Sequence, residues 1–437
     1  MDILIKNADI ITCNENNKVI KNGCLGIKDG YIEYLGDNID YLEDMNAVRV
    51  IDGTNKIVMP GLVNAHTHCA MTILRNFAND MPLEDWLFRH VFPAEAKLTQ
   101  EDVYWGTLLG ISEMVRSGTT TFADMYLYMD EVARAVSEAG VRANLSRSPL
   151  KFDKDGKSEA ANEHSMCSQY YKDWNNKAEG RIKVYIEVHS VYLFDKENLI
   201  ASANLARELN TGIHIHILET LKEREESIGK YGMNSAEICL ETGVFDVPVM
   251  AAHCVHLSDS DVEILKNKGV NVVHNPTSNL KLGSGIARVP ELLKRGINVS
   301  LGTDGAASNN NLNMFEELHI ASLIHKGIHR DSDLLSAREV IRMATVNGAK
   351  AAGFEGITGT IENGMKADII IIDTDKPHLC PVNDPVSAIV YSAQGADVDT
   401  VIVNGKIIME KGEIKTIDEA RVRHKVREIA GRILGTR

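Results

Sequence analysis

The chain has 437 residues, of which 44% are hydrophobic and 25% are charged, which is the ordinary composition of a folded globular protein. Its 61 acidic and 47 basic residues give a formal net charge of −14, and such a surface repels the phosphate backbone of nucleic acids. The seven cysteines show no CxxC spacing, so we expect reduced thiols. The sequence shows no signal-peptide or membrane-spanning pattern, so we expect a cytoplasmic protein that does not bind a membrane. Its negative charge also makes nucleic acid an unexpected partner.

Strand patterns separated by turns occupy both ends of the chain. They cover residues 3–5, 19–20, 24–27, 31–35, 367–372, 398–403 and 406–409. Asp29-Gly30 and Asn404-Gly405 are hairpin signals, and the apolar spacing after residue 418 predicts a terminal helix. We infer one composite β-sandwich domain, built from residues 1–58 and 360–437 and ending in that helix.

The middle of the chain alternates strand-like and helix-like stretches. The predicted strands are 118–123, 142–146, 182–187, 212–218, 249–252, 270–273 and 297–301, and helical stretches include 99–117, 129–139, 196–210 and 337–352. Repeated βα units imply a parallel sheet, and this number of units implies a closed barrel. We therefore expect an α/β fold, with a distorted (β/α)8 TIM barrel over residues 59–359 and its chemistry at the carboxyl ends of the strands.

His66-Thr67-His68 is the most informative motif, and it begins seven residues after the end of the strand-like run 56–59. Side chains two apart on a strand point to the same side, so two imidazoles at a strand end are half of a first-row metal site. An isolated HxH is more often a pair of surface or hydrogen-bonded histidines. Three later polar groups, His216, His253 and Asp304, each follow an apolar strand pattern, and they favour the metal interpretation.

The residues His66, His68, His216 and Asp304 form a ligand set suited to one divalent ion, with zinc as the default and iron or manganese as alternatives. Such an ion lowers the pKa of its bound water toward about 7. His214 is assigned to packing, because Glu219 lies three residues beyond His216 at the strand exit.

Two further groups near these ligands have candidate catalytic roles. Glu219 is a candidate proton shuttle, although an acidic residue there would also stabilise a helix N-terminus. His253 is a candidate for polarising water or an oxyanion, and a core histidine is the alternative.

In these motifs the chain resembles the amidohydrolase superfamily, and within it the 5-methylthioadenosine/S-adenosylhomocysteine deaminases. The matching motifs extend over nearly the whole chain: residues 60–68, 84–87, 93–95, 214–216 with 219, 253, 274–282 and 301–305. The strand after Ile186 carries His189 and no lysine that could be carboxylated to bridge two metals, which favours a single metal.

The resemblance implies hydrolytic deamination of an adenine nucleoside at C6, giving the inosine analogue and ammonia. In this scheme Glu219 delivers a proton to N1, Asp304 accepts the proton of the water, and His253 assists. The resemblance also implies substrate contacts: Glu95 with the ribose hydroxyls, His189 with the purine edge, Trp86 against the nucleoside and Arg147 with the carboxylate of a homocysteine tail.

Two departures leave the 5′ substituent open among 5-methylthioadenosine, S-adenosylhomocysteine, adenosine and 5′-deoxyadenosine. Relatives commonly have proline after His-Ser, where this chain has Val191. Relatives that accept the amino-acid tail often carry a second arginine after the one matched by Arg147, whereas residues 151–161 offer only Lys151, Lys154 and Lys157.

Other interpretations remain beside this one. The runner-up is a related aminohydrolase acting on guanine, a pterin or a triazine, and Glu95 with Arg147 favours the nucleoside over a free base. A non-catalytic scaffold is disfavoured because the site is complete. A cytidine-type deaminase requires a PCxxC motif, which is absent. The oligomeric state is left open, with a homo-oligomer as one option.

Overall fold

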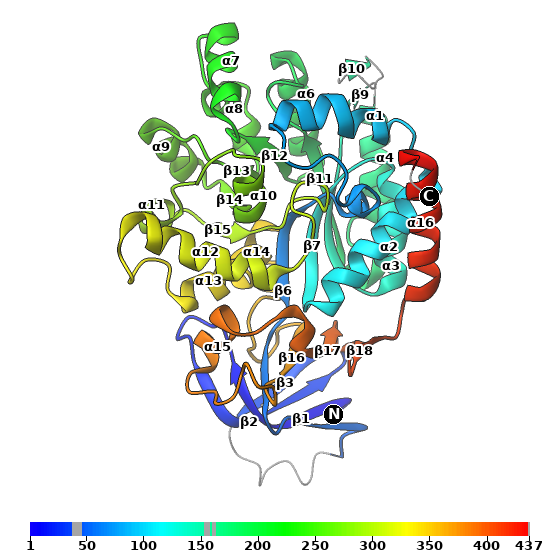
Figure 1. The fold of residues 1–437 in the computed structure, drawn as a ribbon, viewed down its shortest axis with the longest axis vertical. Helices are drawn as coiled ribbons and strands as arrows, with labels where there is room; N and C mark the ends of the chain where they lie inside the picture. The colour runs from blue at the N-terminus through cyan, green and yellow to red at the C-terminus, as the bar shows by residue number, and fades with distance from the viewer. Residues whose placement is uncertain (37–45, 153–157, 160–162, 436–437) are drawn as a thin grey trace.

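The computed structural model describes residues 1–36, 46–152, 158–159 and 163–435 (Figure 1). Eight parallel strands form its central sheet in the order β15-β14-β13-β12-β11-β8-β7-β6. They are β6 (Leu62–Thr67), β7 (Thr119–Met125), β8 (Arg142–Arg147), β11 (Ile182–Val188), β12 (Ile213–Ile217), β13 (Val249–His253), β14 (Asn271–His274) and β15 (Val299–Leu301). The predicted α/β barrel is confirmed.

The helices of the barrel connect and cover these strands. They are α1 (Phe92–Glu95), α2 (Gln100–Arg116), α3 (Met129–Ala139), α4 (His164–Trp174), α5 (Lys177–Gly180), α6 (Lys196–Glu208), α7 (Leu221–Tyr231), α8 (Ser235–Glu241), α9 (Asp259–Lys268), α10 (Pro276–Lys281), α11 (Val289–Lys294), α12 (Met314–His329), α13 (Ala337–Met343) and α14 (Val346–Ala351), with the 3-10 helices η1 (Cys69–Leu74) and η3 (Val244–Asp246) and the π-helix η2 (Asp85–Val91).

The barrel closes between its first and last strands through the residues that follow β15. The amide of Asp304 donates to the carbonyl of His66 at 3.0 Å. The buried Asn64 side chain accepts from the amide of Thr303 at 2.9 Å and donates to its hydroxyl at 2.7 Å. This seam places the β6 histidines beside Asp304.

Strands from both ends of the chain join in a second, nine-stranded sheet, drawn below the barrel in Figure 1. They are β1 (Ile3–Ile11), β2 (Val19–Lys28), β3 (Tyr31–Gly36), β4 (Arg49–Asp52), β5 (Lys56–Pro60), β16 (Ile369–Asp373), β17 (Val398–Val403), β18 (Lys406–Glu410) and β19 (Glu413–Ile414). Tyr31, at the start of β3, also forms an antiparallel bridge with Lys366, just before β16, although β3 and β16 are not neighbours in the strand order. Both predicted hairpins are present, while the boundaries at 58/59 and 359/360 stay predictions.

The strand that carries the HxH motif differs from the one suggested by the sequence. The run 56–59 belongs to β5 in the terminal sheet, and a separate strand, β6, begins at Leu62 and holds His66. Gly61 makes the crossing, where a Cβ atom would overlap the Thr120 side chain. The sequence does not reveal this boundary between two strands, because residues 57–65 are all buried and no exposed turn separates β5 from β6.

The two sheets are joined by a buried ion pair. The Arg142 guanidinium, at the start of β8, donates to both carboxylate oxygens of Asp368, at 2.6 and 3.1 Å. Asp368 also accepts from the amide of Asn404, at the tip of the β17–β18 hairpin. One carboxylate therefore ties the barrel to the terminal sheet.

The C-terminal segment returns from the terminal sheet to the barrel. It contains α15 (Pro385–Tyr391), η4 (Gly395–Asp397) and α16 (Glu419–Leu434), and α16 runs along α2 (Figure 1, red). Arg116 on α2 pairs with Glu419 at 2.6 Å. In the described part of the chain, no helix is both long enough and apolar enough to cross a bilayer.

Candidate metal centre and active site

Three imidazoles and one carboxylate converge at the carboxyl ends of the barrel strands. The Nε2 atoms of His68 and His216 lie 3.2 Å apart, and Asp304 Oδ1 lies 3.4 Å from Nε2 of His66 and 3.4 Å from Nε2 of His68. Ligand atoms at about 2.0–2.1 Å from a tetrahedral zinc ion lie roughly 3.3 Å from one another. The spacing of these four side chains therefore fits one ion.

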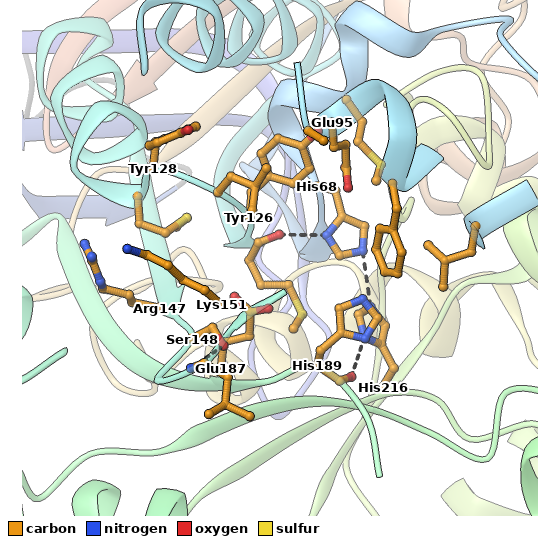
Figure 2. Close-up of a pocket in the computed structure, with 18 of the residues that line it drawn as sticks. His68, Glu95, Tyr126, Tyr128, Arg147, Ser148, Lys151, Glu187, His189 and His216 are labelled. Atoms are coloured by element: carbon orange, nitrogen blue, oxygen red, sulfur yellow. Dashed lines mark hydrogen bonds between the residues drawn. The ribbon is translucent and has the colours of Figure 1, made fainter. Parts of the chain in front are cut away.

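The opposite ring nitrogens are held by hydrogen bonds. Nδ1 of His68 donates to the carbonyl of Met125, and Nδ1 of His216 donates to the carbonyl of His189, both at 2.7 Å (Figure 2). A neutral imidazole with its proton on Nδ1 has a lone pair on Nε2. With both protons on Nδ1, the two Nε2 atoms direct lone pairs toward each other at 3.2 Å, an arrangement that a cation between them would stabilise.

His66 is held by a histidine outside the ligand set. Nδ1 of His66 lies 2.9 Å from Nε2 of His214, and Nδ1 of His214 lies 3.3 Å from the Ser146 hydroxyl. A proton donated from His66 to His214 leaves the lone pair of His66 Nε2 directed at the centre. That atom is buried and has no hydrogen-bond partner among the described residues, as expected of a metal ligand.

Burial keeps the imidazoles of His66 and His216 neutral. It lowers the pKa of His66 to about 4 and that of His216 well below its usual value. Burial alone would raise the pKa of Asp304, but the close approach of His66, at 3.4 Å, and the electrostatic effect of the neighbouring histidines hold it well below its usual range. Neutral imidazoles and an ionised carboxylate are the protonation states that bind a divalent ion.

Asp304 is oriented by hydroxyl donors on its other side. Oδ2 accepts from Ser278 at 2.7 Å and from Ser308 at 2.8 Å, which leaves Oδ1 directed at the histidines. The backbone of Asp304 has a positive φ of 62°, a conformation that aspartate tolerates better than most residues. Asp304 therefore presents Oδ1 to the centre.

Glu219 and His253 lie together beside the ligands. Their side chains approach to 3.8 Å between Oε2 and Nε2, and Glu219 Oε1 accepts from the Ser284 hydroxyl at 3.3 Å. Burial raises the pKa of Glu219 to about 7, a value at which a carboxyl group exchanges protons at neutral pH. Burial lowers the pKa of His253, but the carboxylates of Glu219 and Asp304 outweigh that effect and raise it.

A cavity of about 570 Å³ opens from this centre, a volume typical of small-molecule sites. Apart from His66, which lies behind its wall, all the site residues predicted from the sequence line it: Trp86, Glu95, Arg147, His189, His68, His216, Glu219, His253 and Asp304. Figure 2 shows His68, His189 and His216 at one end and Arg147 and Lys151 at the other, with Ser148 and Glu187 drawn between them. The structure therefore brings the predicted groups together.

Two of the predicted substrate-binding residues have buried polar atoms without partners in the described structure. They are Oε1 of Glu95, at the end of α1, and Nε1 of Trp86, on η2. Burial raises the pKa of Glu95 to about 7, while the Tyr126 hydroxyl acts in the opposite direction. Unpartnered buried atoms in a cavity wall are suited to hydrogen bonds with a polar ligand.

The cavity wall contains residues that the sequence did not single out. Glu187 on β11 is buried, and its Oε2 has no hydrogen-bond partner in the described part of the chain. Asn279 on α10 does not line the cavity, but it accepts from Nδ1 of His253, which does, at 2.8 Å. The motif 274–282 was a signal for Asn279, whereas Glu187 had none beyond its strand position. Lys154 and Lys157 lie outside the described residues.

Comparisons with known proteins agree with this geometry. Residues 57–408 match the model of the amidohydrolase family. The chain is 67% identical over 434 residues to the 5-methylthioadenosine/S-adenosylhomocysteine deaminase of Acetivibrio thermocellus, covering 99% of this chain and 100% of that protein. It is 48% identical over 429 residues to the 5′-deoxyadenosine deaminase of Methanosarcina mazei, covering 98% of each. A crystal structure of a zinc-bound adenosine deaminase from Xanthomonas campestris matches with a TM-score of 0.95 at 30% identity, covering 100% of this chain and 99% of that one.

Proposed function

Because the chain belongs to the amidohydrolase family, we propose that it deaminates an adenine nucleoside hydrolytically at C6. The products are the corresponding inosine analogue and ammonia. Candidate substrates are 5-methylthioadenosine, S-adenosylhomocysteine, adenosine and 5′-deoxyadenosine. The activities named for the relatives, and a cavity with polar groups at both ends, support this proposal.

The observation that carries the proposal is the pair of Nε2 atoms, on His68 and His216, that face each other at 3.2 Å. With His66 and Asp304 they would hold one divalent ion, for which we propose zinc, with iron or manganese as alternatives. When bound, such an ion supplies Lewis acidity and a hydroxide nucleophile at neutral pH.

Proton transfer is assigned to the carboxylates beside the candidate ligands. Glu219, with its pKa near neutrality, would donate a proton to N1 of the purine, which makes C6 more electrophilic. Asp304 would accept the proton of the attacking water. His253, raised in pKa by Glu219 and Asp304, would stabilise the developing oxyanion with a charged hydrogen bond.

Substrate binding is assigned to the remaining wall of the cavity. Glu95 would accept hydrogen bonds from the two ribose hydroxyls, since a carboxylate can accept from both. His189, whose ring centroid lies 4.7 Å from that of His216, would contact the purine edge. Trp86 would pack against the nucleoside. A free base such as guanine would leave Glu95 without a diol partner.

The proposal is tested with purified, metal-loaded protein and a panel of the four nucleosides, guanine, a pterin and a triazine. Release of ammonia and the purine absorbance report deamination. We expect turnover of the adenine nucleosides and much less of the others. Turnover of guanine, the pterin or the triazine, with no nucleoside accepted, would overturn the assignment. The cytoplasmic location and a homo-oligomeric state stay predictions.

A further inference from the structure

The end of the cavity away from the candidate metal ligands contains an arginine whose charge is already neutralised. Arg147 Nη1 lies 2.9 Å from Asp130 Oδ2, and Arg147 Nη2 lies 3.6 Å from Glu163 Oε2. The Arg147 side chain is mostly buried, and its Cζ lies 5.6 Å from the centre of the Tyr170 ring. Two carboxylates therefore flank the guanidinium before any substrate binds.

Both carboxylates are fixed by second partners. Asp130 Oδ1 accepts from the indole Nε1 of Trp174 at 2.9 Å. Glu163, which is buried just before α4, accepts at Oε1 from Lys151 Nζ at 2.9 Å. Among the described residues at this end of the cavity, the positive charges of Arg147 and Lys151 are thus balanced by the negative charges of Asp130 and Glu163.

A substrate that brought a carboxylate to this end would have to compete with these ion pairs. It could displace Asp130 or Glu163 from Arg147, or it could bind as a third anion around the same cation. Either route separates a partly buried ion pair or adds a like charge, and both are unfavourable. A hydrogen atom, a methylthio group or an amine at the 5′ position meets no such opposition.

We propose that Asp130 and Glu163 are specificity-determining residues that select against a carboxylate on the 5′ substituent by occupying the Arg147 guanidinium. The substrates favoured in this way are adenine nucleosides whose 5′ substituent is neutral or carries only an amine. The inference rests on the proposed deamination of adenine nucleosides and specifies which members of that class react best.

The experiment compares three substrates that differ only at the 5′ end, using the metal-loaded enzyme. They are 5-methylthioadenosine, S-adenosylhomocysteine and the decarboxylated analogue of the latter, which keeps the amine and loses the carboxylate. In the unsubstituted protein we expect S-adenosylhomocysteine to have the lowest kcat/KM. The difference should lie in KM, because the tail is remote from C6.

Isosteric variants test the two acids. Asp130→Asn and Glu163→Gln should each raise the kcat/KM ratio of S-adenosylhomocysteine to 5-methylthioadenosine by about fivefold, the effect of one ion pair. Glu131→Gln is the matched control, because Glu131 lines the same cavity but pairs with Arg134. Calorimetric binding of the two inosine-type products should show the same ratios without turnover.

The outcomes separate this inference from the proposed function. A ratio that falls or stays constant in both variants, or an unsubstituted enzyme that prefers S-adenosylhomocysteine to its decarboxylated analogue, would overturn the specificity assignment. Turnover of 5-methylthioadenosine reports whether each variant is folded. If Glu163→Gln does not fold, the kcat/KM ratio of Asp130→Asn alone decides the test, because Asp130 is exposed and its replacement should not disturb folding. Failure of every nucleoside to react would instead contradict the proposed deamination.

Discussion

Nδ1 of His66 lies 2.9 Å from Nε2 of His214, so a histidine outside the ligand set orients the most deeply buried candidate ligand. His214 is in turn 3.3 Å from the Ser146 hydroxyl. This chain of contacts sets which nitrogen of His66 carries the proton, and hence whether its Nε2 lone pair is available to an ion.

Replacing His214 should therefore weaken metal binding without removing a ligand. We expect His214→Phe to lower metal affinity by about tenfold to hundredfold, measured by competition with a chromogenic chelator. His325→Phe is the control, since His325 is another fully buried histidine away from the ligands. Equal loss of affinity in both variants would show a general effect of disturbing the core.

Glu219→Gln should remove the proton donor while leaving the candidate ligands intact. We expect kcat/KM for 5-methylthioadenosine to fall by about 10²- to 10⁴-fold, with metal content unchanged. Glu226→Gln, an exposed acid on α7, should behave like the unsubstituted protein. Retention of near-full activity in Glu219→Gln would assign proton transfer to another group.

The carboxyl of Glu95 predicts a pH dependence of substrate binding. Burial raises its pKa to about 7, so it is ionised, and able to accept from both hydroxyls, only above that pH. As the pH falls through 7, Glu95 takes up a proton and KM for adenosine should rise. Adenosine lacking both ribose hydroxyls should not show this rise, and Glu95→Gln should flatten it for adenosine. The same pH profile with and without the hydroxyls would place Glu95 elsewhere.

The Arg142–Asp368 pair predicts a large stability effect far from the cavity. Arg142→Met should lower the free energy of unfolding by about 3–5 kcal/mol, because it leaves the buried Asp368 carboxylate without its charged partner. Lys406→Met, which breaks the exposed pair with Glu179, should change it by less than about 1 kcal/mol. Urea denaturation followed by circular dichroism measures both.

Local patterns in the sequence predicted the positions of most of the strands along the chain. β17 occurs at the predicted residues 398–403, and α3 at 129–139. The predicted helix 337–352 instead divides into α13 and α14 near Thr345, whose φ and ψ of −132° and −96° are not helical. Periodicity continues across such a break, so the sequence alone does not reveal it.

The sequence was less informative about contacts between distant segments. His214 was assigned to packing, yet it contacts His66 across 148 positions of the chain. The family resemblance implied that Arg147 contacts a carboxylate of the substrate, but nothing near it in the sequence showed that Asp130 and Glu163 already flank its guanidinium. Such pairings depend on the tertiary fold, which brings α3 and α4 to the end of β8.

The most direct test of the central claim is the metal content and its position, measured by anomalous diffraction together with activity before and after chelation. We predict one divalent ion per chain between His66, His68, His216 and Asp304, loss of nucleoside deamination on chelation, and recovery when zinc is returned. Full ammonia release from metal-free protein, or an ion bound by other residues, would contradict the account.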